Sequence, residues 1–320
     1  MDLAKGIAIL TVLVHHVTNR RFRFGTLEAL LLIKCFLAWT VFVFILCSGF
    51  LQGANPREES YFTFCVRRAK RLLIPYFTIG AAYLVWFYGV EVFKNPSLGF
   101  HAGDLLRRFA GYAFFAEYSS EQMYFLPMLF LVAVIHEGNL RLLSRAKAPA
   151  PGLLLVIVGL TTALAVILTA TDFPLRLSLY TLSLSLFYYS FGYLLASVPR
   201  QRWVQLGVPL SLVGLAVAWG RVDASAPAFA IAIPWVVFWL CTETRRSLPG
   251  RALLEYLGRI SSFIFIYHSP LVIHPIIRAL CRAGLGDWCV IFFSIPLTLV
   301  SCAGLHLLVT KWRPLRFLKV

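Results

Sequence analysis

The sequence predicts an all-α protein that crosses a membrane about ten times. Of its 320 residues, 59% are hydrophobic and only 14% are charged, and the mean hydropathy is +0.78. A water-soluble domain is far more polar, so this composition indicates a polytopic membrane protein. The net charge of +16 does not indicate nucleic-acid binding, because the basic residues fall in short clusters between apolar runs.

Ten apolar stretches, separated by proline, glycine and basic clusters, are the expected membrane helices. They cover residues 3–18, 29–52, 72–93, 123–138, 152–170, 176–197, 204–219, 227–242, 256–277 and 289–309. The longest connection, 94–122, is expected to be an amphipathic segment on the outer side. Because no internal repeat or detachable soluble domain is evident, residues 1–320 are expected to form one membrane domain.

The distribution of positive charge predicts the orientation of these helices. With an internal N-terminus, nineteen of the 30 Lys and Arg residues fall on inner segments and ten on outer segments. Inner loops of membrane proteins carry the excess of Lys and Arg. Both termini are therefore expected in the cytoplasm, and the chain is expected to be a multi-pass protein of the cytoplasmic membrane. Lys34 falls inside the second apolar stretch and has no assigned role.

The first apolar stretch contains ionisable residues that a plain membrane anchor would lack. Lys5 and His16 are eleven residues apart, which at 100° per residue is roughly 20° from a whole number of turns, so they share a helix face. An imidazole at membrane depth indicates a functional site, and its pKa suits proton transfer near neutral pH. His15 points about 100° away from His16 and is expected to pack between helices.

A basic cluster precedes the third apolar stretch on the inner side. Four of the five residues from 67 to 71 are positively charged. Arg68 and Arg71 are three residues apart, so on a helix they project from one face, and guanidinium groups suit the recognition of phosphate. Coenzyme A carries several phosphate charges and is cytosolic. The alternative interpretation is an ordinary anchor of the positive-inside kind.

Four blocks carry a family resemblance by their order and spacing. They are Asp2-x-x-Lys5-Gly6 ending at His16, the run Phe-Ile-Leu-Cys-Ser-Gly-Phe at 44–50, the basic block 67–76 with Arg68-x-x-Arg71, and Leu-Glu-Tyr-Leu-Gly-Arg-Ile-Ser at 254–261 followed by Ile-Tyr-His-Ser-Pro-Leu at 266–271. Over almost its whole length the chain resembles the acyltransferase-3 family of integral-membrane acyltransferases. Two positions depart from that family: Cys47, and Lys5 where many members have arginine.

The resemblance implies a membrane O-acyltransferase. Such an enzyme takes an acyl group, expected to be acetyl, from a cytosolic acyl-CoA co-substrate and passes it to a hydroxyl of a carbohydrate or glycan acceptor. His16 would be catalytic, and Arg68 and Arg71 would bind the donor. Lys5 would hold donor phosphates, position the substrate or only mark the inner end of its helix, while His268 and Tyr267 would line the site.

His101, His136, His274 and His306 are expected to pack or to lie at interfaces. No bound cofactor is expected, and no metal site, because the H-E-x-x-H pattern is absent and the scattered histidines do not form a ligand set. The alternative is a proton-coupled secondary transporter that uses intramembrane His and Lys groups, although the symmetry of matching inverted halves is missing.

Overall fold

The computed structural model describes residues 1–19, 40–95, 101–113, 121–145, 179–200, 227–243 and 249–311. In these ranges every regular element is helical and there is no strand, which confirms the all-α prediction. Among the described residues, three helices are long and apolar enough to cross a membrane, namely Tyr61–Lys94, Phe125–Ser144 and Trp288–Lys311. The predicted stretches 152–170 and 204–219, and Lys34, lie outside the described residues, so the ten spans and their orientation stay predictions.

The chain divides into two compact units. Unit 1 comprises Met1–Asn55 with Phe191–Lys319, and unit 2 comprises Pro56–Ser190. The helices that unit 1 holds in full are α1 (Asp2–Asn19), α3 (Thr40–Ala54), α10 (Pro227–Glu243), α11 (Arg251–Arg259), α12 (Ser261–Tyr267), α13 (Ile273–Arg282) and α14 (Asp287–Lys311). Helix α8 (Leu179–Ser197) crosses the boundary between the two units.

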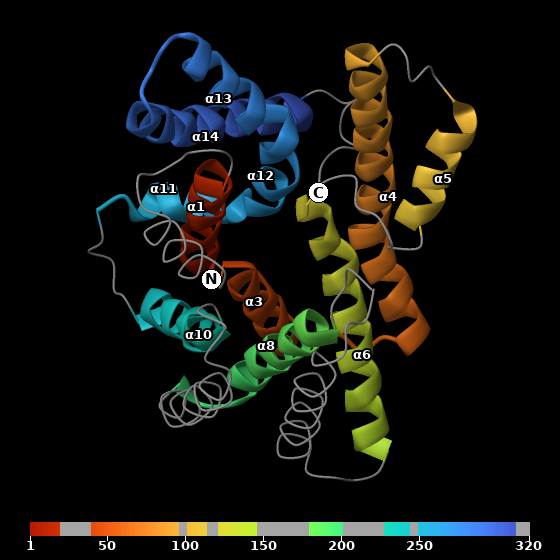
Figure 1. The fold of residues 1–320 in the computed structure, drawn as a ribbon. Coiled ribbons are helices and arrows are strands. Elements are labelled where there is room, and N and C mark those ends of the chain that lie inside the picture. The colour runs from red at the N-terminus through yellow and green to blue at the C-terminus, as the bar shows by residue number, and fades with distance from the viewer. Residues whose placement is uncertain are drawn as a thin grey trace. The chain divides into compact units, whose positions relative to one another are not determined.

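Helix α1 is the centre of unit 1. It packs against α3, α10, α11, α12 and α14 (Figure 1). The crossing with α11 brings the two backbones together: a Cβ on Gly6 would overlap the backbone carbonyl of Leu254, and a Cβ on Gly258 would overlap that of Asp2. Glycine permits such close approach of helices because it has no side chain. The two glycines therefore fix how α1 sits on α11.

The prediction of one continuous helix over 256–277 is wrong, because the helix is interrupted twice in this range. Helix α11 ends at Arg259 and α12 begins at Ser261; the π-helical turn η4 (His268–Val272) then separates α12 from α13. Ser269 has extended backbone angles, φ −128° and ψ 135°. The physical reason is Pro270, since a proline disfavours the α conformation in the residue before it. His268 thus lies at a break between helices.

Unit 2 is built on the long helix α4 (Tyr61–Lys94), with α5 (Ala102–Ala113), η2 (Glu121–Tyr124), α6 (Phe125–Arg145) and the first part of α8. Helix α4 packs against α5 and α6. At its start the Ser60 hydroxyl accepts a hydrogen bond from the Thr63 backbone N–H at 3.1 Å, as N-caps do. The predicted membrane stretch 72–93 lies inside α4, so the basic cluster 67–71 is on the same helix.

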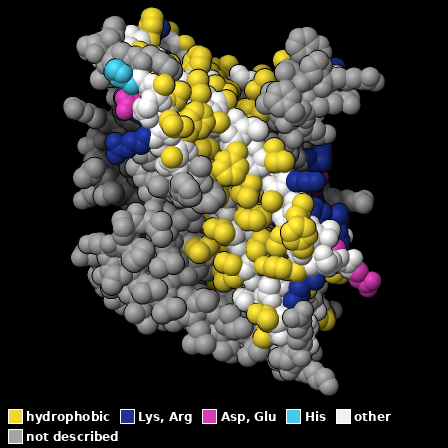
Figure 2. Space-filling view, turned by 90° about the vertical axis from the view of Figure 1, so that its right-hand side faces the viewer, with side chains coloured by type: hydrophobic (Ala, Val, Ile, Leu, Met, Phe, Trp, Pro, Cys, Tyr) yellow, Lys and Arg dark blue, Asp and Glu magenta, His cyan; other side chains and the backbone are white. Residues whose placement is uncertain are grey.

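Helix α5, which lies within the predicted amphipathic connection 94–122, is hydrogen-bonded to α4. The Tyr76 hydroxyl donates to the backbone carbonyl of Tyr112 at 3.0 Å, the Tyr112 hydroxyl donates to that of Tyr76, and the two rings stack at 4.4 Å. A Cβ on Gly80 would overlap the Tyr112 hydroxyl, so this position needs glycine. Hydrophobic side chains cover much of the face that carries α4 (Figure 2). On α4 the side chains of Phe77, Val85, Trp86 and Phe93 are exposed, which suits contact with lipid.

Candidate functional site

The two histidines that the sequence singles out lie next to each other in unit 1. His16, near the end of α1, is half-buried, and His268, at the start of η4, is completely buried. Their ring centroids are 4.9 Å apart. The ring centroid of His15 is 5.6 Å from that of His16, and the two rings are almost perpendicular. The fold therefore brings the imidazole of His16, on the central helix α1, next to that of His268.

The hydrogen bonding of His268 determines which of its nitrogens can accept a proton. Its Nδ1 is 2.9 Å from the backbone carbonyl of Ile264. A carbonyl only accepts, so Nδ1 carries the hydrogen, and Nε2 of the neutral ring is an acceptor. Nε2 is buried and has no hydrogen-bond partner among the described residues. Leaving a buried polar atom unsatisfied costs about 1–3 kcal/mol, so this nitrogen is suited to receive a donor from outside the described residues.

The other two unit 1 residues expected at the site have different surroundings. The Tyr267 ring is buried and packs on Phe263 at 4.4 Å, and Phe263 in turn meets the ring of His306 at 5.1 Å. Lys5 lies on the same continuous helix as His16, and its Nζ pairs with the Asp2 carboxylate at 2.8 Å. The pair is partly exposed, and exposed pairs contribute at most about 1 kcal/mol, so Lys5 can exchange Asp2 for another anion.

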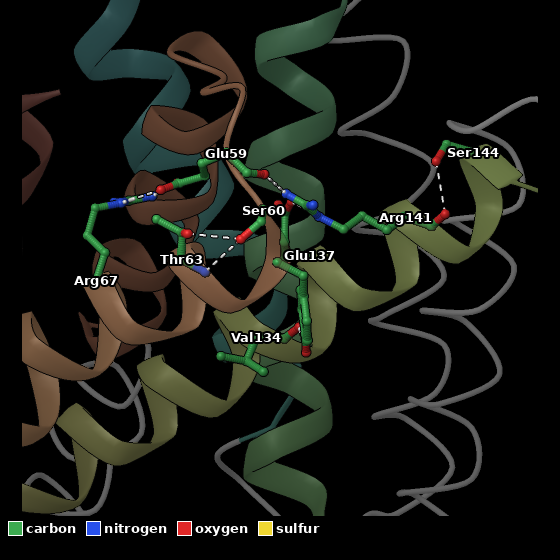
Figure 3. A network of polar contacts seen from close by, with 9 residues as sticks. Glu59, Ser60, Thr63, Arg67, Val134, Glu137, Arg141 and Ser144 are labelled. Atoms are coloured by element: carbon green, nitrogen blue, oxygen red, sulfur yellow. Dashed lines mark hydrogen bonds and ion pairs between the residues drawn. The ribbon is translucent and has the colours of Figure 1, made fainter.

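Arg67 and Arg141 have carboxylate partners within unit 2 (Figure 3). Arg67 binds the Glu59 carboxylate with two nitrogens. Arg141 donates to the Glu137 carboxylate and to the backbone carbonyl of Glu59, both at 2.7 Å. The hydrogen bond from Arg67 lowers the pKa of Glu59 below its usual value. These two arginines therefore hold the start of α4 against α6.

Arg68 and Arg71 lie one turn apart on α4, in different surroundings. Arg68 is half-buried; its Nη2 donates to the Tyr189 hydroxyl at 3.2 Å, and its guanidinium lies over the Phe64 ring at 5.3 Å. Arg71 is exposed, as is Lys70, and neither has an ion pair among the residues that the structure describes. Arg71 is thus available to an anionic ligand, whereas the Arg68 guanidinium contacts Tyr189 and Phe64.

A family model described as an acyltransferase domain, that of acyltransferase-3, matches residues 1–307. The chain belongs to the acyltransferase-3 family. No match is found among curated proteins or among solved structures. Family membership confirms the predicted class of enzyme, an acyltransferase, rather than the alternative of a transporter. Together with the apolar helices it supports a membrane acyltransferase.

In this acyltransferase-3 chain, the predicted residues fall into two groups. The histidine pair and Lys5 belong to unit 1, whereas Arg68 and Arg71 belong to unit 2. Each group is a candidate site in its own right. Among the described residues no group of three or more His, Cys, Asp or Glu side chains could hold a metal ion.

Sequence reasoning missed the surroundings of Arg68. His136, expected only to pack or to lie at an interface, is completely buried, and its Nδ1 is 2.9 Å from the Ser190 hydroxyl. The Tyr189 ring meets the His136 ring at 5.3 Å. The signal in the sequence is the polar run Tyr-Tyr-Ser at 188–190 in the middle of an apolar stretch, because buried polar groups in a membrane helix are usually paired or functional.

Proposed function

We propose that this membrane acyltransferase moves an acyl group, acetyl in the simplest case, from cytosolic acyl-CoA to a hydroxyl of a carbohydrate or glycan acceptor at the cytoplasmic membrane. The observation that carries the proposal is the pair formed by His16 and the buried His268, 4.9 Å apart on the central helix of unit 1 and the break beside it. Acyl transfer to a hydroxyl needs a base of moderate pKa, and imidazole is such a base.

In the proposed reaction His16 takes the proton from the acceptor hydroxyl while its oxygen attacks the thioester carbonyl carbon. A carbon–oxygen bond forms, the carbon–sulfur bond breaks, and the proton passes from His16 to the departing sulfur, which yields the ester and free CoA. His268 supports this step because its Nε2 can accept a hydrogen bond from the imidazolium that forms at His16, or from the acceptor itself.

The donor is proposed to bind through its phosphates to Arg68 and Arg71. The charge pairing in unit 2 supports this choice within the basic cluster, because Arg67 is neutralised by Glu59 whereas Arg71 is exposed. Guanidinium groups hold phosphate through two parallel hydrogen bonds. Three roles are proposed for Lys5: it holds donor phosphates, positions the substrate or only marks the inner end of its helix. Its pairing with Asp2 is compatible with each of these roles.

Labelled acetyl-CoA incubated with membranes that contain the protein tests the proposal. We expect label to appear in a hydroxyl-bearing acceptor, and His16→Ala to reduce the transfer by at least about 100-fold, the usual contribution of a positioned base. His15→Ala is the matched control and should retain transfer, while binding of CoA by the purified His16→Ala protein shows that it is folded. Unchanged transfer by His16→Ala would refute the assignment.

A further inference from the structure

The guanidinium of Arg68 is held by one side chain from α8 and one from its own helix, α4. Tyr189, on α8, accepts a hydrogen bond from Arg68 Nη2 at 3.2 Å, and the Tyr189 side chain is completely buried. The ring of Phe64, on α4 itself, lies 5.3 Å from the guanidinium carbon. Arg68 is therefore fixed on one side by a phenol and on another by an aromatic face.

Tyr189 is itself held in place. His136, on α6, meets the Tyr189 ring edge-on at 5.3 Å, and its Nδ1 shares a hydrogen bond with Ser190 at 2.9 Å. Both His136 and Ser190 are buried, at 0% and 3% exposure. Contacts thus run from Ser190 through His136 and Tyr189 to Arg68, and they join α8, α6 and α4. A side chain with such support keeps one orientation, which a lone surface arginine does not.

We infer that Tyr189 is a positioning residue, which orients the Arg68 guanidinium for the phosphates of acyl-CoA, with His136 and Ser190 holding Tyr189. The inference rests on the proposed function, in which Arg68 binds the donor. A guanidinium has five N–H donors, and the hydrogen bond to Tyr189 uses one of them. Pre-orientation raises affinity because less side-chain freedom is lost on binding. Arg71 is exposed, and no contact of this kind to it is found among the described residues.

The variant Tyr189→Phe tests the inference, because it removes the hydroxyl and keeps the ring. We expect KM for acetyl-CoA in the membrane assay, and Kd for CoA with the purified protein, to rise about tenfold, the loss of one hydrogen bond to a charged group. The kcat should change by less than about twofold, because the reacting atoms are not touched. Tyr188→Phe is the matched control: Tyr188 is the adjacent buried tyrosine, its ring packs edge-on against Phe187 at 5.2 Å, and the same measurements should not change.

The Arg68→Ala background separates positioning from a general structural role. A residue that acts through Arg68 has nothing to orient once that guanidinium is gone, so Tyr189→Phe should then leave Kd unchanged. An equal loss of affinity in both backgrounds would overturn the inference. If Tyr189→Phe lowers the melting temperature, Ser190→Ala tests the same contacts from the far end, with an expected rise in Kd of about threefold that again vanishes in Arg68→Ala.

The outcomes also distinguish this inference from the proposed function. Wild-type protein that binds CoA, with Tyr189→Phe binding it equally well, overturns the role of Tyr189 and leaves the donor site intact. Wild-type protein that binds no CoA overturns the donor site and the role of Tyr189 together.

Discussion

Replacing Gly6 by alanine tests how tightly α1 is seated on α11. The new Cβ would overlap the backbone carbonyl of Leu254, and a backbone atom cannot turn aside as a flexible side chain can. Overpacking of this kind costs about 1–3 kcal/mol. Alanine recovers about 0.5–1 kcal/mol because it favours a helix over glycine. We therefore expect a net loss of about 1–2 kcal/mol in the free energy of unfolding.

Thermal unfolding in detergent measures this effect, and Gly304→Ala is its control. Gly304 lies in the interior of α14, and a Cβ there would meet no atom within 4 Å, so the control should be neutral or stabilised by up to about 1 kcal/mol. Acyl transfer should fall with Gly6→Ala, because α1 carries His16. Equal melting temperatures for Gly6→Ala and Gly304→Ala would refute the close crossing of α1 and α11.

Three further predictions concern unit 2. Arg71→Ala should raise KM for acetyl-CoA about tenfold, whereas Lys70→Ala, its exposed neighbour, should leave KM within about twofold; equal effects would argue against a specific role for Arg71. Because the hydrogen bond from Arg67 lowers the pKa of Glu59, the stabilisation by this pair is present above the usual carboxyl pKa of 4.5 and is lost as the pH falls through the lowered value. Glu59→Gln should therefore melt below wild type at pH 7 and match it in strong acid, and a difference that persists in acid would contradict this. Tyr112→Phe should lower the free energy of unfolding by about 1 kcal/mol and speed proteolytic cleavage near α5, while unchanged cleavage would show that the hydroxyl does not fasten α5.

The helical class and the extent of most described helices could be predicted from composition and apolar runs, because burial in lipid requires long apolar helices. The position of His16 on a continuous first helix also follows from local spacing. The break beside His268 was missed, although Ser269-Pro270 carried the signal, since a residue before proline avoids the α conformation. A count of apolar residues over 256–277 does not register that restriction.

Contacts between distant segments account for the rest of what was missed. Four charges at 67–71 are visible in the sequence, but which of them is neutralised depends on Glu59 turning back onto Arg67. Likewise, the support of Arg68 by Tyr189 joins residues 121 positions apart, and no local pattern encodes such a pairing. The pairing of His16 with His268 is of the same kind.

The length of α4 has a consequence for any ligand held by Arg68 and Arg71. Its 34 residues extend over roughly 50 Å at 1.5 Å per residue, whereas the hydrocarbon layer of a bilayer is about 30 Å thick. A helix of this length that spans the bilayer upright exceeds the acyl-chain layer, and with the predicted stretch 72–93 in the lipid its first turns, which carry Arg68 and Arg71, would lie outside the hydrocarbon. Because Arg68 and Arg71 are fixed on this helix, an anion bound by them would be held at one distance from the membrane core.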